Sequence, residues 1–146
     1  MFVGEYLHTL DGKFRLMLPS KYQAQLASGL FVTKGLGKSL RIYERETFEK
    51  RSQRIIELPT MDIESQALRQ FWFSSAQDAV PDSQGRIVIS EKLRGSIGIG
   101  AGAEVALVGN YDFIELFTRE EWAKQTLIVN GVTNAENSAM WAKYGI

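Results

Sequence analysis

The chain has 146 residues, of which 45% are hydrophobic, and its 17 basic side chains balance its 17 acidic ones. This size and composition fit a globular protein with a real core and exclude a disordered chain. No apolar run approaches the ~20 residues needed to span a membrane. The absence of cysteine and the single histidine argue against disulfides, a zinc site and any secreted role, so we expect a cytoplasmic protein without a metal or cofactor.

Basic residues are concentrated near the start of the chain. Residues 1–52 hold nine Lys or Arg against five Asp or Glu. No acid lies between Asp11 and Glu44, a stretch that contains six basic residues. Because a field depends on where charges lie rather than on their total, a neutral chain of this kind can still present a basic surface to nucleic acid.

The first part of the chain predicts short strands separated by turns. In order, we expect a strand at 6–9, a tight turn at 11–14, a strand at 15–19, a short helix, strands at 30–34 and 40–43, and a closing helix that ends before Pro59. Ser20 and Gln23 fit a capping box for the short helix, and Gly29 is expected to stop it.

The same order of elements recurs in the second half, because aligning Asp11 with Asp82 also aligns Arg15 with Arg86. This half predicts strands at 76–80, 86–90, 104–109 and 113–117, a short helix capped by Ser90, and a closing helix with a capping box at Thr118 and Glu121. Duplications of this length indicate units that need a neighbour to bury a core.

Two further helices are expected outside the repeated units. One covers 62–74, with Ile63, Leu68, Phe71 and Trp72 on an apolar side, and the other starts at Asn134 and carries Met140, Trp141 and Tyr144. We interpret these side chains as packing on the protein's own core or on a neighbouring subunit. The chain would thus divide into repeat one at 5–52, a linking helix at 53–76, repeat two at 77–124 and a helical tail at 125–146.

The repeated turn has a defined chemistry. Asp82 suits the first corner of a type I turn, and Gly85 suits the left-handed position of a three-residue hairpin loop. Arg86 would then face Asp82 across the strands, a pair worth roughly 0.2–1 kcal/mol. A single turn of this kind is most simply structural, but two copies could present matching arginines to a target.

Residues 1–50 and 76–124 resemble the MraZ family of bacterial regulators, which are built from two tandem AbrB-like segments. The resemblance rests on MFVGEYLHTLDGKFR at the start, on SSAQDAVPDSQGRIVIS, and on LRGSIGIGAGAEVALVGNYDFIELFTREEW. It implies an α+β, β-rich fold in which two swapped-hairpin repeats form a pseudo-dimeric β-barrel with peripheral helices. It also implies a ring of subunits that binds short direct repeats in promoter DNA, usually that of the cell division and cell wall gene cluster, mostly as a repressor.

The chain departs from the family pattern at several positions near the first turn. Phe14 stands where glycine precedes the first arginine, and a left-handed phenylalanine would cost roughly 1–2 kcal/mol. Gly12 could let the turn change type and avoid that cost. Val3 and Gln23 stand where the family usually has basic residues, and Ser90 where proline is common.

Our hypothesis is that the first turn and its strand bind DNA. Arg15 could hold a guanine edge, and Lys13 would bind beside it. His8, Lys21, and also Lys34 and Lys38 would contact phosphates. Asp11 would orient Arg15. Arg86 could line the same surface or be purely structural, and the sequence leaves both open.

Other functional classes find less support in the sequence. No catalytic triad, phosphate-binding glycine motif or metal-ligand spacing is found, so we expect no enzyme, no small-molecule substrate and no cofactor. A protein-interaction module, such as an antitoxin-type partner binder, is the alternative to a DNA-binding regulator.

Overall fold

The computed structural model describes residues 1–130 and 134–145, so 131–133 and 146 of the expected tail lie outside the described residues. The strands are β1 (Glu5–Thr9), β2 (Arg15–Met17), β3 (Leu30–Lys34), β4 (Ser39–Glu44), β5 (Gln77–Ala79), β6 (Arg86–Val88), β7 (Glu104–Gly109) and β8 (Ile114–Thr118). The helices are α1 (Ser20–Leu26), α2 (Arg45–Ile56), α3 (Ile63–Ser74), α4 (Glu91–Ile97), α5 (Arg119–Asn130) and α6 (Asn134–Lys143). The predicted α+β class is confirmed. Across the described residues, none of these helices has the length and apolarity required to cross a membrane.

Six strands form one antiparallel sheet in the order β1-β7-β8-β4-β3-β5. Strands from the two halves alternate at its ends, since β1 pairs with β7, and β5 pairs with β3. The sheet is open, with β1 and β5 as its edges, so the predicted closed barrel is not confirmed. β2 and β6 pair with each other in a separate ribbon and do not bridge those edges. The swapped-hairpin description stays a prediction.

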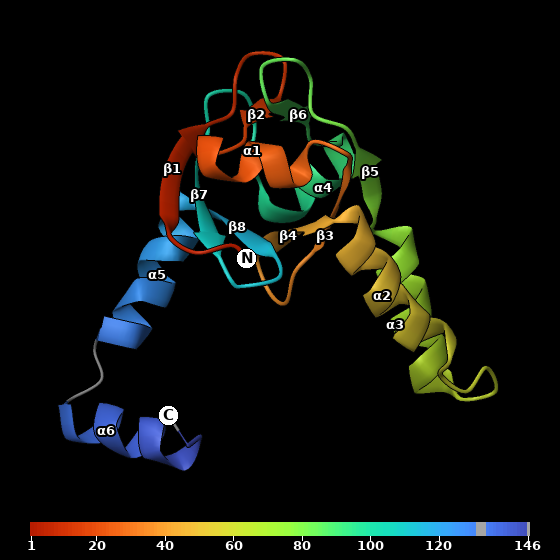
Figure 1. Cartoon of the computed structure of the whole chain (residues 1–146), viewed down its shortest axis with the longest axis vertical. Helices are drawn as coiled ribbons and strands as arrows, with labels where there is room; N and C mark the ends of the chain where they lie inside the picture. Colours follow the sequence, from red (N-terminus) through yellow and green to blue (C-terminus); the bar gives the residue numbers. More distant parts are fainter. Residues whose placement is uncertain (131–133, 146) are drawn as a thin grey trace.

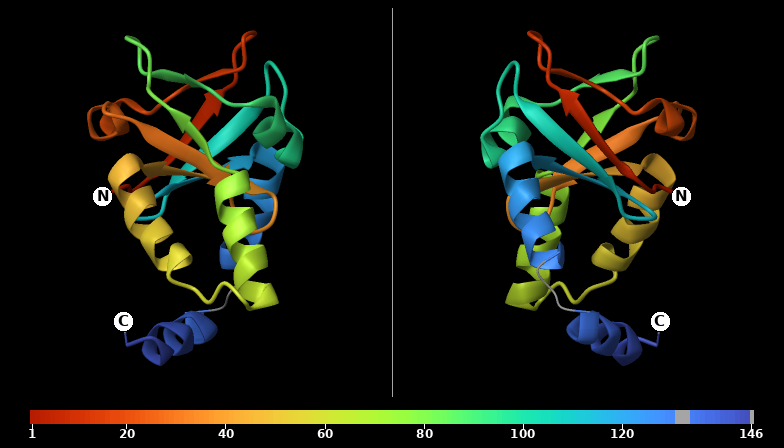
Figure 2. Two further views of the ribbon diagram at one scale, coloured as in Figure 1. Left: turned by 90° about the vertical axis from the view of Figure 1, so that its right-hand side faces the viewer. Right: turned by 90° about the vertical axis from the view of Figure 1, so that its left-hand side faces the viewer.

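The ribbon of β2 and β6 brings the two repeated turns to one end of the molecule. Arg15 lies opposite Val88, and Met17 lies opposite Arg86, in antiparallel register. Each strand begins directly after its turn, so the turns lie at opposite ends of the ribbon and their tips rise on either side of it (Figure 1, Figure 2). The two strands joined by each turn do not pair with each other. The strand before the turn, β1 or β5, pairs in the main sheet, whereas the strand after it, β2 or β6, lies in the ribbon.

Two hydrophobic clusters lie on opposite faces of the sheet, because successive strand residues point to opposite sides. Val32 and Ile42 point into the larger cluster, whereas their neighbours Phe31 and Tyr43 point into a smaller aromatic one. The larger cluster is closed by the inward side chains of the ribbon and of α1 and α4, which include Leu16, Leu26, Ile87 and Leu93. The ribbon is therefore anchored through one face only, and its other face points outward.

Three of the predicted helix starts are confirmed by side-chain caps. The capping hydrogen bonds are Ser65 N–H to Asp62 Oδ2 (3.3 Å), Leu93 N–H to Ser90 Oγ (3.3 Å) and Glu121 N–H to Thr118 Oγ1 (3.0 Å). An N-cap oxygen satisfies a backbone donor that the helix leaves unpaired, which fixes where the helix begins.

The predicted capping box of α1 is wrong. The helix follows Pro19 directly, and no side chain caps it. The proline ring fixes its own φ near the value that leads into a helix, so the start does not require Ser20 as a cap. Gln23 is used differently, because its Nε2 donates to the Leu18 carbonyl at 2.8 Å.

Helices α2 and α3 run side by side and extend away from the sheet (Figure 1, Figure 2). Trp72 holds them together, since its ring stacks on Phe48 at 5.3 Å and its Nε1 donates to Ser52 Oγ at 2.9 Å. The predicted apolar side of α3 thus contributes Trp72 to the protein's own core. Ile63, on the same helix, is 87% exposed.

Candidate nucleic-acid interface

The two repeated turns contain the same hydrogen-bond network. In the first, Asp11 Oδ1 accepts the N–H groups of Lys13 (2.8 Å) and Arg15 (2.9 Å), and Asp11 Oδ2 accepts Arg15 Nε at 2.7 Å. In the second, the matching bonds run from Gln84 N–H (3.0 Å), Arg86 N–H (2.9 Å) and Arg86 Nε (2.8 Å) to Asp82. The predicted pairing of Asp82 with Arg86 is confirmed, and Asp11 pairs with Arg15 in the same way.

This network keeps both carboxylates ionised and both arginines oriented. The backbone N–H of Arg15, followed by its side chain, lowers the pKa of Asp11 to about 2. The backbone N–H of Arg86 is likewise the first cause that lowers the pKa of Asp82. Each arginine is held through Nε, and among the described residues the η nitrogens have no hydrogen-bond partner. Each guanidinium therefore keeps a two-nitrogen edge available to a ligand.

The residue before each arginine is left-handed in both turns, with φ of 61° at Phe14 and 80° at Gly85. The expected change of turn type at Gly12 does not occur, because Phe14 N–H bonds to the Asp11 carbonyl as Gly85 N–H bonds to that of Asp82 (3.0 and 2.9 Å). Packing offsets the backbone strain at Phe14, since its ring is half-buried against the main core.

Arg94 also packs on Phe14, and sequence reasoning missed it. Its Cζ lies 3.7 Å from the centroid of the Phe14 ring, and its Nε donates to the Ile89 carbonyl at 3.0 Å. The alignment of the two units contained a signal, because Arg94 occupies the position of Gln23, whose side chain packs on Gly85 at the other turn.

The outward face of the ribbon brings four side chains together, and we call these four the ribbon face: Arg15, Met17, Arg86 and Val88. They share one side because strand side chains alternate and the residues between them, Leu16 and Ile87, are buried. The two arginines lie on one diagonal and the two apolar side chains on the other, with diagonal neighbours roughly 7–8 Å apart. Arg86, which the sequence left open, is thus placed on the same surface as Arg15.

The other predicted contacts lie at different distances from this face. Lys13 is exposed at the tip of the first turn, and Lys21 is exposed in the first turn of α1. His8 is half-buried on β1, and burial lowers its pKa, so it is a neutral hydrogen-bonding group at pH 7. Lys34 and Lys38 flank the loop between β3 and β4, which lies away from the two turns (Figure 1). The structure does not bring them to the ribbon face.

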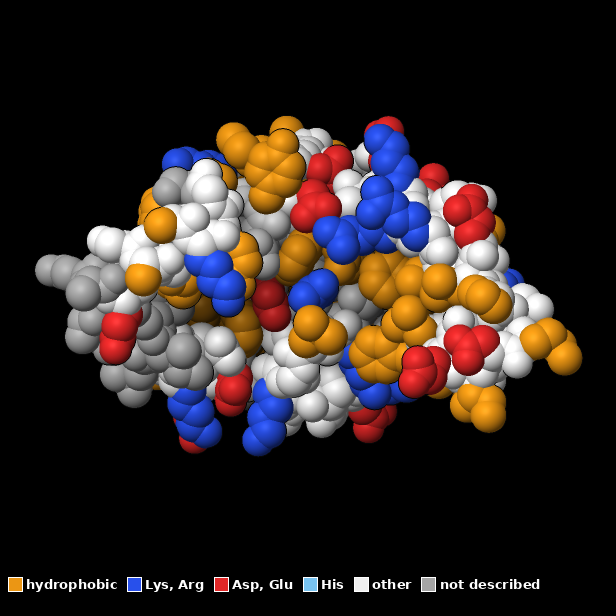
Figure 3. Space-filling model, turned by 90° about the horizontal axis from the view of Figure 1, so that it is seen from below, with side chains coloured by type: hydrophobic (Ala, Val, Ile, Leu, Met, Phe, Trp, Pro, Cys, Tyr) orange, Lys and Arg blue, Asp and Glu red, His pale blue; other side chains and the backbone are white. Residues whose placement is uncertain are grey.

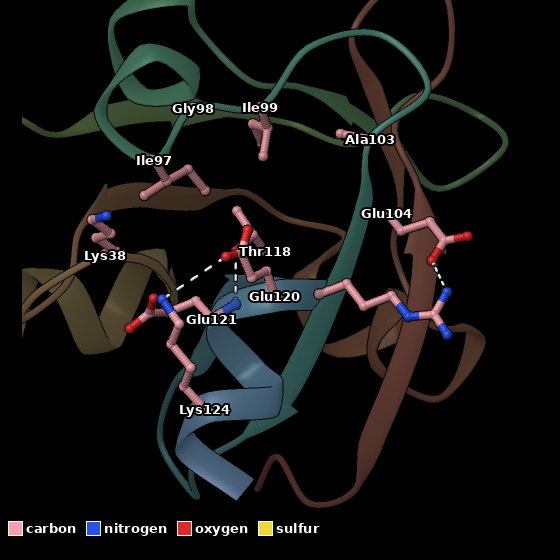
Figure 4. A pocket seen from close by; sticks show the side chains of 11 residues that line it. Lys38, Ile97, Gly98, Ile99, Ala103, Glu104, Thr118, Glu120, Glu121 and Lys124 are labelled. Carbon is pink, nitrogen blue, oxygen red and sulfur yellow. Dashed lines mark hydrogen bonds and ion pairs between the residues drawn. The ribbon is translucent and has the colours of Figure 1, made fainter. Parts of the chain in front are cut away.

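Lys38 instead lines a hollow of about 340 Å³ beside the start of α5 (Figure 4). The charges there are matched locally, because Arg119 pairs with Glu104, and Lys124 Nζ lies 3.9 Å from Glu120 Oε1. Acidic groups at a helix start oppose the binding of a further anion. Within the described part of the chain, no three His, Asp or Glu side chains are placed to hold a metal ion.

Comparison with known proteins identifies the family of this chain. The family model described as "MraZ protein, putative antitoxin-like" matches residues 1–71 and, a second time, residues 72–139. The chain belongs to the MraZ family. The doubled match agrees with the doubled turn, because each matched segment contains one Asp-x-x-x-Arg network.

Several MraZ relatives extend over most of the chain, and each carries the name "Transcriptional regulator MraZ". The protein of Corynebacterium diphtheriae is 38% identical over 123 residues, which is 84% of this chain and 85% of that protein. The protein of Leuconostoc mesenteroides is 37% identical (86% and 87% covered), and that of Herpetosiphon aurantiacus is 39% identical (84% of each). These are names of regulators rather than enzymes, which fits the prediction that this chain is not an enzyme.

One solved structure also matches at a low level. The solution structure of PHS018 from Pyrococcus horikoshii has a TM-score of 0.33 and 13% identity, covering 81% of this chain and 90% of that one. A similarity of this size supports no conclusion about fold or function.

Proposed function

We propose that this chain is a sequence-specific DNA-binding regulator of transcription and that the ribbon face with its two turns meets duplex DNA. Membership of the MraZ family and the names of its relatives support the regulatory role. The binding mode is supported by the shape of this end of the molecule, since a two-stranded β-ribbon fits the major groove of B-DNA. Work on chromosomal DNA would place the protein in the cytoplasm, at the nucleoid.

One observation carries the proposal, namely the two arginines held through Nε by ionised aspartates. An arginine fixed in this way needs little further ordering to donate both η nitrogens to the O6 and N7 atoms of a guanine. Asp11 and Asp82 are neutralised by their own arginines, so they orient the side chains without strongly repelling phosphate. Lys13 and Lys21 would bind phosphates, and His8 would act as an uncharged donor.

The remaining features of the proposal concern assembly. A protomer with a few phosphate contacts binds weakly, with a non-specific Kd of about 10⁻⁴–10⁻⁶ M. Joining several protomers in a ring that engages direct repeats would raise the affinity by about 10²–10⁴ without new contacts. We further propose that the protein represses the promoter of the cell division and cell wall gene cluster. The division into repeats at 5–52 and 77–124 is also part of the proposal.

Exposed apolar side chains on α2 and α3 support assembly. Seen from below, hydrophobic side chains gather over the part of the molecule that these helices form (Figure 3). The large apolar side chains that are solvent-exposed in α2, α3 and the loop between them are those of Ile56, Met61, Ile63, Leu68, Phe71 and Phe73. Large exposed apolar patches on a folded chain mark contacts with other molecules, and a copy of the same chain is the partner a ring requires.

The experiment that tests DNA recognition is in-vitro selection of bound duplexes, followed by binding measurements on variants. Arg15→Ala should lose roughly 5- to 150-fold of its preference for the selected sequence, the value of one bidentate base contact. Arg15→Lys keeps the charge and should lose preference while retaining salt-sensitive binding. Arg54→Ala, which removes an exposed arginine on α2, is the matched control. An Arg15→Ala protein with unchanged preference would contradict the proposal.

A second candidate is a module that binds a protein partner. It is favoured by the exposure of Met140 and Trp141 on α6 and of Tyr144 directly after it. A salt titration separates the two functions, because the logarithm of DNA affinity falls linearly with the logarithm of salt concentration. A protein that ignores duplex DNA at low salt would favour the second candidate.

A further inference from the structure

The ribbon face exposes two apolar side chains beside its arginines. Met17 is 37% exposed and Val88 is 52% exposed, although their strand neighbours Leu16 and Ile87 already supply the buried face. The pattern occurs at equivalent positions of both repeats, and it places each apolar side chain directly opposite an arginine of the other strand.

Both positions are held in place by polar side chains from outside the ribbon. Gln23 Nε2 donates to Met17 Sδ at 3.7 Å, while it also bonds to the Leu18 carbonyl. Gln77 Nε2 donates to the Val88 carbonyl at 2.8 Å. These contacts position the Met17 sulfur and the Val88 backbone, and both side chains remain partly exposed.

We propose that Met17 and Val88 are specificity-determining residues that contact the C5-methyl groups of thymines in the major groove. This inference rests on the proposed function, and it names the base-edge chemistry that the ribbon face reads besides guanine. The thymine methyl is the one apolar group that a base edge presents in the major groove, and apolar side chains are its usual partners. Because each apolar side chain lies opposite an arginine, the thymines belong in base pairs next to those that the arginines contact.

The test replaces single thymines of the selected duplex by deoxyuridine, which removes only the methyl group. Dissociation constants are measured by fluorescence anisotropy at fixed salt for each substituted duplex. We expect deoxyuridine to weaken binding by about fourfold at each contacted position, the value of one buried methyl group. The variants Met17→Gln and Val88→Asn should each reduce that ratio to near one at the thymine that the side chain contacts, since both replace the apolar tip by an amide and leave no methyl group.

The control variant is Leu36→Gln, which removes an exposed apolar side chain from the β3–β4 loop. It should retain the full deoxyuridine penalty. Unfolding curves and the salt slope of binding check that Met17→Gln and Val88→Asn still fold and still bind phosphates. Val88 is 52% exposed, so Val88→Asn removes no core side chain and remains informative if Met17→Gln fails to fold.

The outcomes separate this inference from the proposed function. A wild-type protein that selects no duplex contradicts both. A protein that binds its selected duplex but is indifferent to deoxyuridine at every position overturns only the reading of thymine. The same holds if the penalty persists unchanged in both ribbon variants, whereas its loss in them and its retention in Leu36→Gln support the inference.

Discussion

The Cζ atom of Arg94 lies 3.7 Å from the centroid of the Phe14 ring, so the helix that follows the second turn packs on the first turn. At the other end of the ribbon Gln23 takes the corresponding place, and a Cβ added at Gly85 would lie 2.4 Å from its Cδ. Each turn therefore packs against a side chain of the opposite repeat. Arg94 lies on the Phe14 ring at the first turn, and the Gln23 amide lies on Gly85 at the second.

Replacing Phe14 by glycine tests whether this packing outweighs the strain of a left-handed phenylalanine. Glycine relieves roughly 1–2 kcal/mol of strain, but the ring's burial and its cation–π contact are lost. We expect the free energy of unfolding to fall by about 1–2 kcal/mol, measured by urea denaturation. The control is Tyr111→Gly, because Tyr111 also has a positive φ, of 67°, but its side chain is exposed. That variant should match or slightly exceed wild-type stability, and equal losses in both would contradict the packing argument.

The variant Arg94→Gln copies the arrangement at the other turn. Its amide can still reach the Ile89 carbonyl, as Gln23 reaches that of Leu18, but it cannot stack as a cation on Phe14. A double-mutant cycle of Arg94→Gln with Phe14→Gly should give a coupling energy of about 0.5–2 kcal/mol. Strictly additive losses of unfolding free energy would show that the two side chains act independently.

The sequence predicted the local features of this fold better than the contacts between distant segments. The Asp82–Arg86 pair, the left-handed Gly85 and the caps at Ser90 and Thr118 depend on short-range geometry, and the structure confirms them. The pairing of β2 with β6 and the open sheet depend on contacts between distant segments, which spacing alone does not encode. Arg94 was missed for the same reason, since its partner lies in the other repeat.

Stability should depend on pH through the two turn carboxylates. The folded-state pKa of Asp11 is lowered from 3.8 to about 2, so the unfolded chain binds more protons in that window. The stabilisation is therefore complete above the ordinary pKa and is lost as the pH falls toward 2, and Asp82 acts in the same direction.

Urea unfolding at pH 5 and at pH 2.5 measures this dependence. The double variant Asp11→Asn with Asp82→Asn should be less stable than wild type at pH 5 and should lose less stability on acidification. The control variant Asp78→Asn removes an exposed carboxylate of β5 that takes no part in either turn. Its loss of unfolding free energy between pH 5 and pH 2.5 should equal that of wild type. If the double variant shows the wild-type loss between the two pH values, the turn carboxylates are not responsible.

The two turn tips should differ in their contribution to salt-dependent binding. Lys13 and Gln84 occupy equivalent positions, but only Lys13 carries a charge. Lys13→Ala should reduce the slope of log affinity against log salt by about 0.9, the value of one phosphate contact, and weaken binding to all duplexes alike. Gln84→Ala should leave the slope unchanged. Equal slopes for Lys13→Ala and wild type would remove Lys13 from the proposed interface.

Assembly should depend on the exposed side of α3, independently of the ribbon face. The double variant Ile63→Ser with Leu68→Ser removes two exposed apolar side chains, so the stability of the protomer should change by about 0.5 kcal/mol or less. Its assembly mass, measured by sedimentation velocity, should fall, and affinity for DNA with several repeats should fall by about 10²–10⁴ while affinity for a single repeat stays the same. Leu36→Ser, which removes an apolar side chain of similar exposure, should change neither quantity. A double variant that keeps its full assembly mass would place the contact between subunits on a surface other than α3. The proposed contact of each protomer with DNA through the ribbon face would not be affected by that result.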